Sequence, residues 1–475
     1  MTTTHRPLTV VSLLLSLFMG ALEATVVSTA MPTVIGDLGG IQLYSWVFTA
    51  YLVAATVTVP IFGKLADTYG RKPVALFGVA LFMLGSVASG ASRSMTQLIA
   101  FRIVQGLGAG AMQPMALTIA GDIFSLEERA RIQGVFGAVW GLAGLAGPMV
   151  GGLIVKHIGW RWVFYLNVPF GIASMLLLVL FFHERIEKKP HELDLAGFAL
   201  VTALVLALLT SAHGGTAGIV GLVAAALSTV GFVLVERRAS EPVIPLPLMR
   251  RRVIWVASLA GALAGGAMFA MVTYVPLFVQ GVTRGSPTAA GSAIAPMVIG
   301  WPIASAIGGR LIPRTGFRPL VLLGLFISAA ASIGVALVVA RPDPSLDLLR
   351  IATGMFGVGL GFGNTSLLIA VQTSVDWKER GVATAGTMFF RMIGGALAVG
   401  VTGGVLTRIL TRDPSVPLEA ANALLGPDRG RSLSAEVQGR LGGALGTGLV
   451  TVLWICAGIG VAAFLVSLAF PRDRR

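Results

Sequence analysis

The chain has 475 residues, of which 55% are hydrophobic and only 12% are charged, and its mean hydropathy is +0.85. Soluble globular proteins carry about 25% charged residues, and disordered chains have low hydrophobicity, so the composition excludes both classes. The single cysteine, Cys456, excludes an intrachain disulfide and a cysteine-based metal site.

Apolar stretches able to cross a bilayer follow one another along almost the whole chain. A spanning helix needs about 20 predominantly apolar residues. The predicted spans are fourteen: 8–30, 44–63, 74–92, 95–119, 131–155, 161–182, 195–212, 217–235, 253–279, 288–309, 319–340, 348–371, 382–407 and 443–470. The first has no clear basic n-region and is too long for an h-region, so we do not interpret it as a signal peptide. The sequence therefore predicts an all-α integral membrane protein with no room for a large catalytic domain.

The basic residues fall mainly on one side of this topology. With the N-terminus in the cytoplasm, 22 of the 35 Lys and Arg residues lie in inner segments, and five of the others lie in loop 408–441. This is the positive-inside pattern, so topology explains the net charge of +14 and a nucleic-acid partner is not needed. We expect a multi-pass protein of the cell (inner or plasma) membrane with both termini cytoplasmic.

An internal repeat divides the chain. Residues 63–73 and 309–319 share Gly, Leu, Gly, a basic residue and Pro at an offset of 246, and residues 102–106 match 350–354 at an offset of 248. Parallel half-repeats around a midplane site are a known transporter architecture. The predicted organisation is a six-helix bundle at 1–190, an inserted transmembrane hairpin at 191–240, and a second six-helix bundle at 241–475 with external loop 408–441.

Five segments carry a family resemblance: residues 22–32, 63–72, 102–106, 147–152 and 159–169. They resemble signatures of the major facilitator superfamily, specifically its fourteen-span drug–proton antiporters. Segment 63–72, GKLADTYGRK, is the most specific match. Two positions depart from the pattern, since Glu23 stands where Asp is usual and Ala143 where Gly is usual. The resemblance implies the major facilitator fold and a proton-coupled exporter that works by alternating access.

Glu23 is the only carboxylate placed well inside a predicted span. A charge near the bilayer centre costs at least about 2.5–3.5 kcal/mol, so it needs a partner, water or a proton. Glu23 lies about 12 Å from the outer end of its span and Arg102 about 10 Å from the outer end of span 4. Because the resemblance makes these spans neighbours, we expect the two residues to form a proton-coupling site, and a permanent structural ion pair is the alternative.

Charged residues and glycines gather at the cytoplasmic ends of spans 2 to 4. Asp67, Arg71 and Asp122 can form ion pairs there, while Gly63 and Gly70 permit a tight turn. The resemblance implies a gate that holds the outward-facing state. The alternative is a surface salt bridge, which is often worth under about 1 kcal/mol.

Span 5 carries a face of small residues that includes Gly147 and Gly151, with Pro148 between them. Small residues let membrane helices pack closely, and the proline removes a backbone hydrogen bond and bends the helix. Close packing accounts for this pattern by itself. A role of the bend in export is implied by the resemblance alone.

Several side chains are candidates for a substrate cavity. Arg391 lies about 15 Å deep in span 13, and the second half has no embedded carboxylate to pair with it. It could meet backbone carbonyls, polar side chains, water or an anionic group of the substrate. The other candidates, which more often serve packing, are Tyr51, Gln113, Tyr274, Asn364 and Met388.

No known phosphate-binding loop, metal-ligand spacing or nucleophile–base arrangement occurs in the chain, so we expect neither an enzyme, a cofactor nor a metal. The leading interpretation is a monomeric, proton-coupled exporter of amphipathic small molecules such as drugs or lipophilic cations. Export of an endogenous metabolite, siderophore or lipid with an anionic group is the second. A membrane sensor or scaffold that transports nothing is the third.

Overall fold

The computed structural model describes residues 4–124, 126–184, 194–211, 215–239, 246–376, 380–412 and 435–472. The side chains of Asp67 and Pro148 lie outside the described part, as does most of the predicted loop 408–441. Every regular element in these ranges is a helix. The all-helical prediction is therefore confirmed for the described residues.

The first half of the chain contains α1 (Arg6–Leu38), α2 (Tyr44–Tyr69), α3 (Arg71–Gly90), α4 (Met95–Ile123), α5 (Leu126–His157), α6 (Trp162–Tyr165) and α7 (Asn167–Phe181). A short 3₁₀ helix, η1 (Ile41–Leu43), precedes α2. The connecting region contains α8 (Leu195–Ser211), α9 (Gly215–Glu236) and α10 (Leu246–Met249). The second half contains α11 (Arg252–Gly281), α12 (Pro287–Thr315), α13 (Phe317–Val339), α14 (Leu346–Thr373), α15 (Arg380–Leu410) and α17 (Ala435–Ser467).

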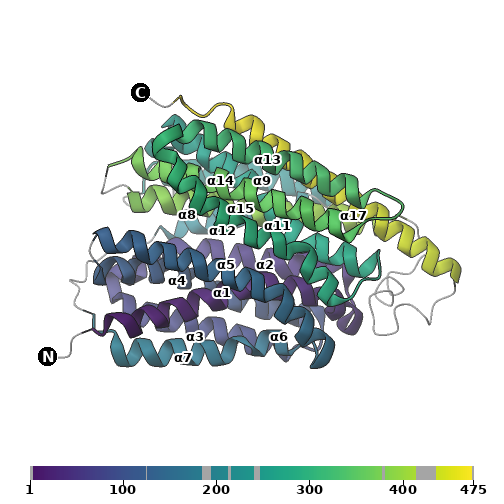
Figure 1. Cartoon of the computed structure of the whole chain (residues 1–475), viewed down its shortest axis with the longest axis horizontal. Coiled ribbons are helices and arrows are strands. Elements are labelled where there is room, and N and C mark those ends of the chain that lie inside the picture. Colours follow the sequence, from purple (N-terminus) through teal and green to yellow (C-terminus); the bar gives the residue numbers. More distant parts are fainter. Residues whose placement is uncertain are drawn as a thin grey trace.

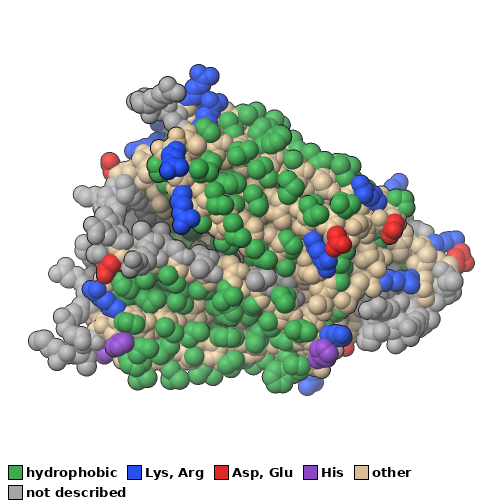
Figure 2. Space-filling model, in the orientation of Figure 1, with side chains coloured by type: hydrophobic (Ala, Val, Ile, Leu, Met, Phe, Trp, Pro, Cys, Tyr) green, Lys and Arg blue, Asp and Glu red, His purple; other side chains and the backbone are tan. Residues whose placement is uncertain are grey.

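The described residues of the predicted apolar ranges lie mostly in helices, and 11 helices among them are long and apolar enough to cross a membrane. The outward-facing sides of the helices carry large exposed hydrophobic side chains, such as Leu84, Leu180 and Leu227, which are 63%, 61% and 69% exposed. Figure 2 shows such side chains covering much of the lateral surface. A band of this size needs an apolar surrounding, which a bilayer provides.

The two halves repeat one packing pattern, with both chain termini at the same end of the molecule (Figure 1). In the first half α3 packs on α4 and α1 on α5, and in the second half α13 packs on α14 and α11 on α15. Gly70 and Gly316, 246 positions apart, both have positive φ, 105° and 80°, at equivalent turns. The sequence offset therefore corresponds to a structural repeat.

The hydrogen bonds that join the halves among the described residues lie toward one end. Hereafter the terminal end is the end that carries both chain termini, and the distal end is the opposite one. At the distal end Tyr44 donates a hydrogen bond to the Thr273 carbonyl, and Gln280 Nε2 donates to the Thr29 carbonyl at 2.9 Å.

Toward the terminal end the halves separate. A Cβ atom built on Gly63 of α2 or Gly386 of α15 would meet nothing within 4 Å. Figure 2 shows the surface hollowed between the halves near this end. The molecule is thus closed at the distal end and open at the terminal end.

The helices of the connecting region lie against this seam. α8 and α9 pack on each other, and α8 also contacts α2 of the first half and α15 of the second. Val201 of α8 and Phe232 of α9 share a small apolar cluster with Phe389 of α15. The connecting helices therefore cover the α2–α15 side of the seam, while α5 and α12 form its other side.

Candidate functional site

A buried ion pair lies in the middle of the first half. The side chains of Glu23 on α1 and Arg102 on α4 are 1% and 2% exposed, and Arg102 Nη1 donates a hydrogen bond to Glu23 Oε1. The other carboxylate oxygen, Oε2, accepts a hydrogen bond of 2.6 Å from Asn167 Nδ2 at the start of α7. Both oxygens of Glu23 are therefore engaged by side chains of other helices.

Arg102 has further partners on two helices. Its Nη1 donates to Gln105 Oε1 at 2.7 Å and its Nε donates to the Val47 carbonyl at 3.3 Å. The centre of its guanidinium lies 4.1 Å from the centroid of the Tyr51 ring on α2, which is a cation–π contact. The cation would consequently keep several contacts if the charge of Glu23 were removed.

A chain of hydrogen bonds continues from Glu23 to the backbone of α6. Asn167 Nδ2 lies 3.0 Å from Ser86 Oγ of α3, and Ser86 Oγ donates to the Phe164 carbonyl at 2.8 Å. Ser86 and Asn167 are fully enclosed. A change in the charge of Glu23 would therefore be felt by α3, α4 and the α6–α7 segment together.

Close backbone contacts hold the network together. A Cβ atom on Gly85 would collide with the backbone of Gln105, and one on Gly106 would lie 2.5 Å from the Tyr51 carbonyl oxygen. Since these contacts leave no space for a side chain, both positions require glycine. They bring α3 and α2 against α4 beside Arg102.

The structure thus brings three of the predicted site residues, Glu23, Arg102 and Tyr51, into one cluster. Gln105, Asn167 and Ser86 were not predicted as part of it. Gln105 lies one helical turn from Arg102, and Asn167 is a polar residue inside an apolar span, so both carried a usable signal. Ser86 carried none, because isolated serines are common in membrane helices.

The predicted gating residues lie at the terminal end. Arg71 Nε is 3.0 Å from Asp122 Oδ2, with side chains 14% and 30% exposed, and Gly70 turns the chain with φ of 105°. Asp67 belongs to the predicted set but its side chain lies outside the described residues. The ion pair joins α3 to α4 within the first half.

Glu184 supports the same turn and was not predicted. Its carboxylate accepts hydrogen bonds from the backbone N–H groups of Arg71 and Lys72 at 2.5 and 3.1 Å. Lys72 Nζ in turn donates to the carbonyls of Val179 and Phe182 at 2.9 and 2.7 Å. An acidic group thus caps the start of α3 and a basic group caps the end of α7, the arrangement that helix dipoles favour.

The glycine face of α5 serves two neighbours. A Cβ atom on Gly147 would collide with Thr25 of α1, and one on Gly151 would lie 3.2 Å from Val26 of the same helix. Six residues before Gly147, Gly141 faces Pro302 of α12, with its Cβ position 2.9 Å from the proline ring. The face therefore joins α5 both to its own half and to the other half.

Comparison with known proteins identifies the family. Residues 13–399 match the family model of the Major Facilitator Superfamily. The chain belongs to this superfamily. It is therefore a multi-pass membrane transporter rather than an enzyme.

Two relatives of this chain come from Bacillus subtilis. Multidrug transporter protein MdtP of Bacillus subtilis is 38% identical over 409 residues, which cover 84% of this chain and 75% of that protein. Multidrug resistance protein 3 of the same organism is 36% identical over 85% of this chain and 80% of its own length.

Among solved structures, an inward-facing bacterial homolog of the human lysosomal transporter Spinster matches with a TM-score of 0.69 at 16% identity, covering 99% of this chain and 98% of that one. A D-xylose–proton symporter matches with a TM-score of 0.65 at 13% identity, covering 99% and 98%. These two likenesses show the fold alone.

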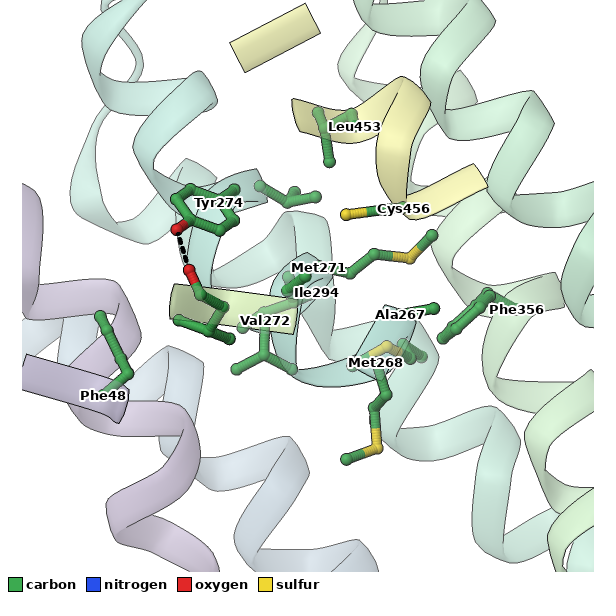
Figure 3. Close-up of a cluster of buried hydrophobic side chains, with 14 of the residues drawn as sticks. Phe48, Ala267, Met268, Met271, Val272, Tyr274, Ile294, Phe356, Leu453 and Cys456 are labelled. Atoms are coloured by element: carbon green, nitrogen blue, oxygen red, sulfur yellow. Dashed lines mark hydrogen bonds between the residues drawn. The ribbon is translucent and has the colours of Figure 1, made fainter. Parts of the chain in front are cut away.

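The remaining candidates of this superfamily member differ in their surroundings. Arg391 and Met388 on α15 and Gln113 on α4 are partly buried, and Asn364 on α14 is 8% exposed. Tyr274 on α11 is fully enclosed, and its hydroxyl donates a 2.7 Å hydrogen bond to the Val399 carbonyl (Figure 3).

Figure 3 places Tyr274 in the same apolar cluster as Met268, Met271 and Cys456. Its hydroxyl bond joins α11 to α15 within the second half.

Proposed function

We propose that this protein is a fourteen-span, proton-coupled exporter of amphipathic small molecules, such as drugs or lipophilic cations. The observation that carries the proposal is the enclosed pair of Glu23 and Arg102, with Asn167 on the second carboxylate oxygen. Ionisable groups at this depth are costly, and they mark substrate pathways and proton relays in membrane proteins. The names of the two Bacillus relatives, a multidrug transporter and a multidrug resistance protein, agree with this class of substrate.

The proposed cycle starts from the conformation described above. The terminal end faces the cytoplasm, as the positive-inside distribution of basic residues favours. Substrate enters between the halves from that side. The halves then rock about the middle of the membrane, the distal contact of Tyr44 with the Thr273 carbonyl opens, and the pair of Arg71 and Asp122 with Gly63 stabilises the closed terminal end.

Proton binding at Glu23 supplies the coupling. A proton from outside neutralises the carboxylate and removes its attraction for Arg102. Because Arg102 also contacts Val47 and Tyr51 of α2, and Asn167 connects Glu23 to α7, loss of the charge rearranges several helices of the first half. Release of that proton into the cytoplasm restores the pair and completes one exchange of proton for substrate.

Reconstitution in liposomes tests the proposal. A pH gradient is imposed, and uptake of a fluorescent lipophilic cation is followed in the wild type, in Glu23→Gln and in Glu436→Gln. The control residue Glu436 is exposed and pairs with Arg440 at 2.8 Å on its own helix. Gradient-driven movement that is lost only in Glu23→Gln supports the proposal. Equal movement in all three proteins would exclude Glu23 as the coupling site, and no flux of any solute would favour a sensor or scaffold.

A further inference from the structure

A second charge lies in the opposite half without an ionic partner. Arg391 is 11 residues from the start of α15, about 17 Å along the helix axis, and its side chain is partly buried. Within the described ranges it forms no ion pair. A cation at this depth is unfavourable unless polar groups, water or an anion compensate it.

Apart from Glu23, no described residue offers a carboxylate in the interior of a helix. Of the 21 acidic residues, only Glu23 lies well inside a predicted span. Glu23 is already held by Arg102 and Asn167. No carboxylate of the described residues therefore compensates Arg391, and an anion from outside the chain or water can do so.

The surroundings of Arg391 resemble a binding surface rather than a packed core. Its guanidinium lies 5.8 Å from the Trp301 ring centroid, on α12. α11 and α14 each pack on both α12 and α15, so the arginine reaches along the inner face of the second half. The aliphatic part of Arg391 covers Gly265 of α11, whereas a Cβ atom on the buried Gly261, one turn nearer the terminal end, would meet nothing within 4 Å.

A second hydrogen-bond donor lies on α14, which packs on both α12 and α15. Asn364 is 8% exposed, and its Nδ2 has no hydrogen-bond partner among the described residues. Asn364 follows Gly361 by one helical turn, and a Cβ atom on Gly361 would lie 2.5 Å from the Trp301 carbonyl oxygen. Among the described residues, an amide donor without a hydrogen-bond partner and a guanidinium without an ionic partner thus lie on α14 and α15, which pack on each other, and both groups are complementary to an oxyanion.

We infer that Arg391, Trp301 and Asn364 form an anion subsite, which binds the carboxylate or phosphate group of an amphipathic substrate. The inference rests on the proposed export function and narrows its substrate class. Molecules that combine an apolar body with an anionic group are bound with the anion at Arg391. Lipophilic cations without such a group use the apolar surface alone.

The test uses one dye in two forms, because the pair differs only at the proposed contact. A xanthene dye as its methyl ester is a cation, and the same dye as its free acid carries an added carboxylate. Equilibrium binding to the purified protein and gradient-driven uptake into liposomes are measured for both forms. The proteins compared are the wild type, Arg391→Met, Arg391→Lys and the control Arg350→Met, whose residue pairs with Asp347 at 2.7 Å near the start of α14.

The expected result is selective. In Arg391→Met the dissociation constant of the free acid rises about tenfold or more, while that of the ester changes by less than about twofold. Arg391→Lys retains part of the affinity, since it keeps the charge but loses the planar fork of donors. Arg350→Met leaves both forms unchanged.

Other results overturn the inference or the function separately. If Arg391→Met weakens the binding of both dye forms equally, or weakens the binding of neither, the anion subsite is refuted. If neither form moves with the gradient in the wild type, the export proposal fails, and the binding measurement still decides the subsite. Arg391→Lys keeps the test decisive where Arg391→Met does not fold.

Discussion

Removal of Arg102 and removal of the Glu23 charge are expected to affect stability unequally. Without Arg102, the carboxylate keeps neutral hydrogen-bond donors such as Asn167 but no cation among the described residues, so an uncompensated buried charge remains. Breaking a buried pair in this way costs about 3–5 kcal/mol. In Glu23→Gln the arginine keeps Gln105, the Val47 carbonyl and the Tyr51 ring, so the loss is nearer about 1–3 kcal/mol.

A double-mutant cycle measures the coupling. Arg102→Met, Glu23→Gln and the double variant are unfolded reversibly in mixed micelles, and the free energies of unfolding are compared with that of the wild type. We expect the double variant to be no less stable than Arg102→Met, because the uncompensated carboxylate is absent from it. This corresponds to a coupling energy of about 1–3 kcal/mol.

Two results would contradict this prediction: the losses in free energy of unfolding of the two single variants simply add in the double variant, or Glu23→Gln is less stable than Arg102→Met. Glu436→Gln with Arg440→Met provides a matched cycle for an exposed pair on one helix. Its coupling energy should be below about 1 kcal/mol.

Three further predictions follow from the packing. Gly85→Ala should lower the free energy of unfolding by about 1–3 kcal/mol, because its Cβ collides with the Gln105 backbone. Gly63→Ala, whose Cβ meets nothing within 4 Å, should leave the free energy of unfolding unchanged and reduce transport turnover. Equal effects of the two variants in the unfolding and flux assays would contradict this prediction. Glu184→Gln should lower the free energy of unfolding by up to about 2 kcal/mol and make it less dependent on salt, because the charge at the start of α3 is lost. An unchanged melting curve would show that the charge does not cap α3. In the double variant Gly141→Cys and Pro302→Cys, the two Cβ positions lie 3.4 Å apart, which is short enough for a disulfide. Oxidation of this variant should stop transport, and reduction should restore it. Full transport by the cross-linked protein would exclude rocking at this contact.

The large-scale organisation could be predicted because it depends on composition and spacing. Apolar runs located the helices, and the offset of 246 residues predicted two similar halves, to which Gly70 and Gly316 correspond at equivalent turns. The superfamily was predicted correctly from short segments such as 63–72, and residues 13–399 match its model. Fourteen spans and the drug–proton antiporter subfamily remain proposals.

Prediction of the candidate site was less complete, since side-chain partners depend on helix rotation. Depth along the spans suggested that Glu23 could reach Arg102, and the structure has them in contact. The contribution of Asn167 depends on where the α6–α7 segment breaks and how it turns toward α1, which spacing does not reveal. Glu184 was missed because a charged residue at the end of a span is usually solvated.

Matched positions of the repeat also differ between the two halves. Arg350 occupies the position in the second half that matches Arg102, yet it pairs with Asp347 one turn away on its own helix and is 37% exposed. The same scaffold therefore holds an enclosed interhelical ion pair in one half and a peripheral one in the other.

This asymmetry has a consequence for transport. The second half holds its only mid-membrane cation, Arg391, on a different helix, next to open space and away from any carboxylate within the described ranges. A site that must exchange protons needs a carboxylate with a defined partner, and a site that must accept varied ligands needs an unoccupied donor. The first half meets the former requirement and the second half meets the latter, so in the proposed cycle separate residues carry proton exchange and ligand binding while the rocking motion couples them.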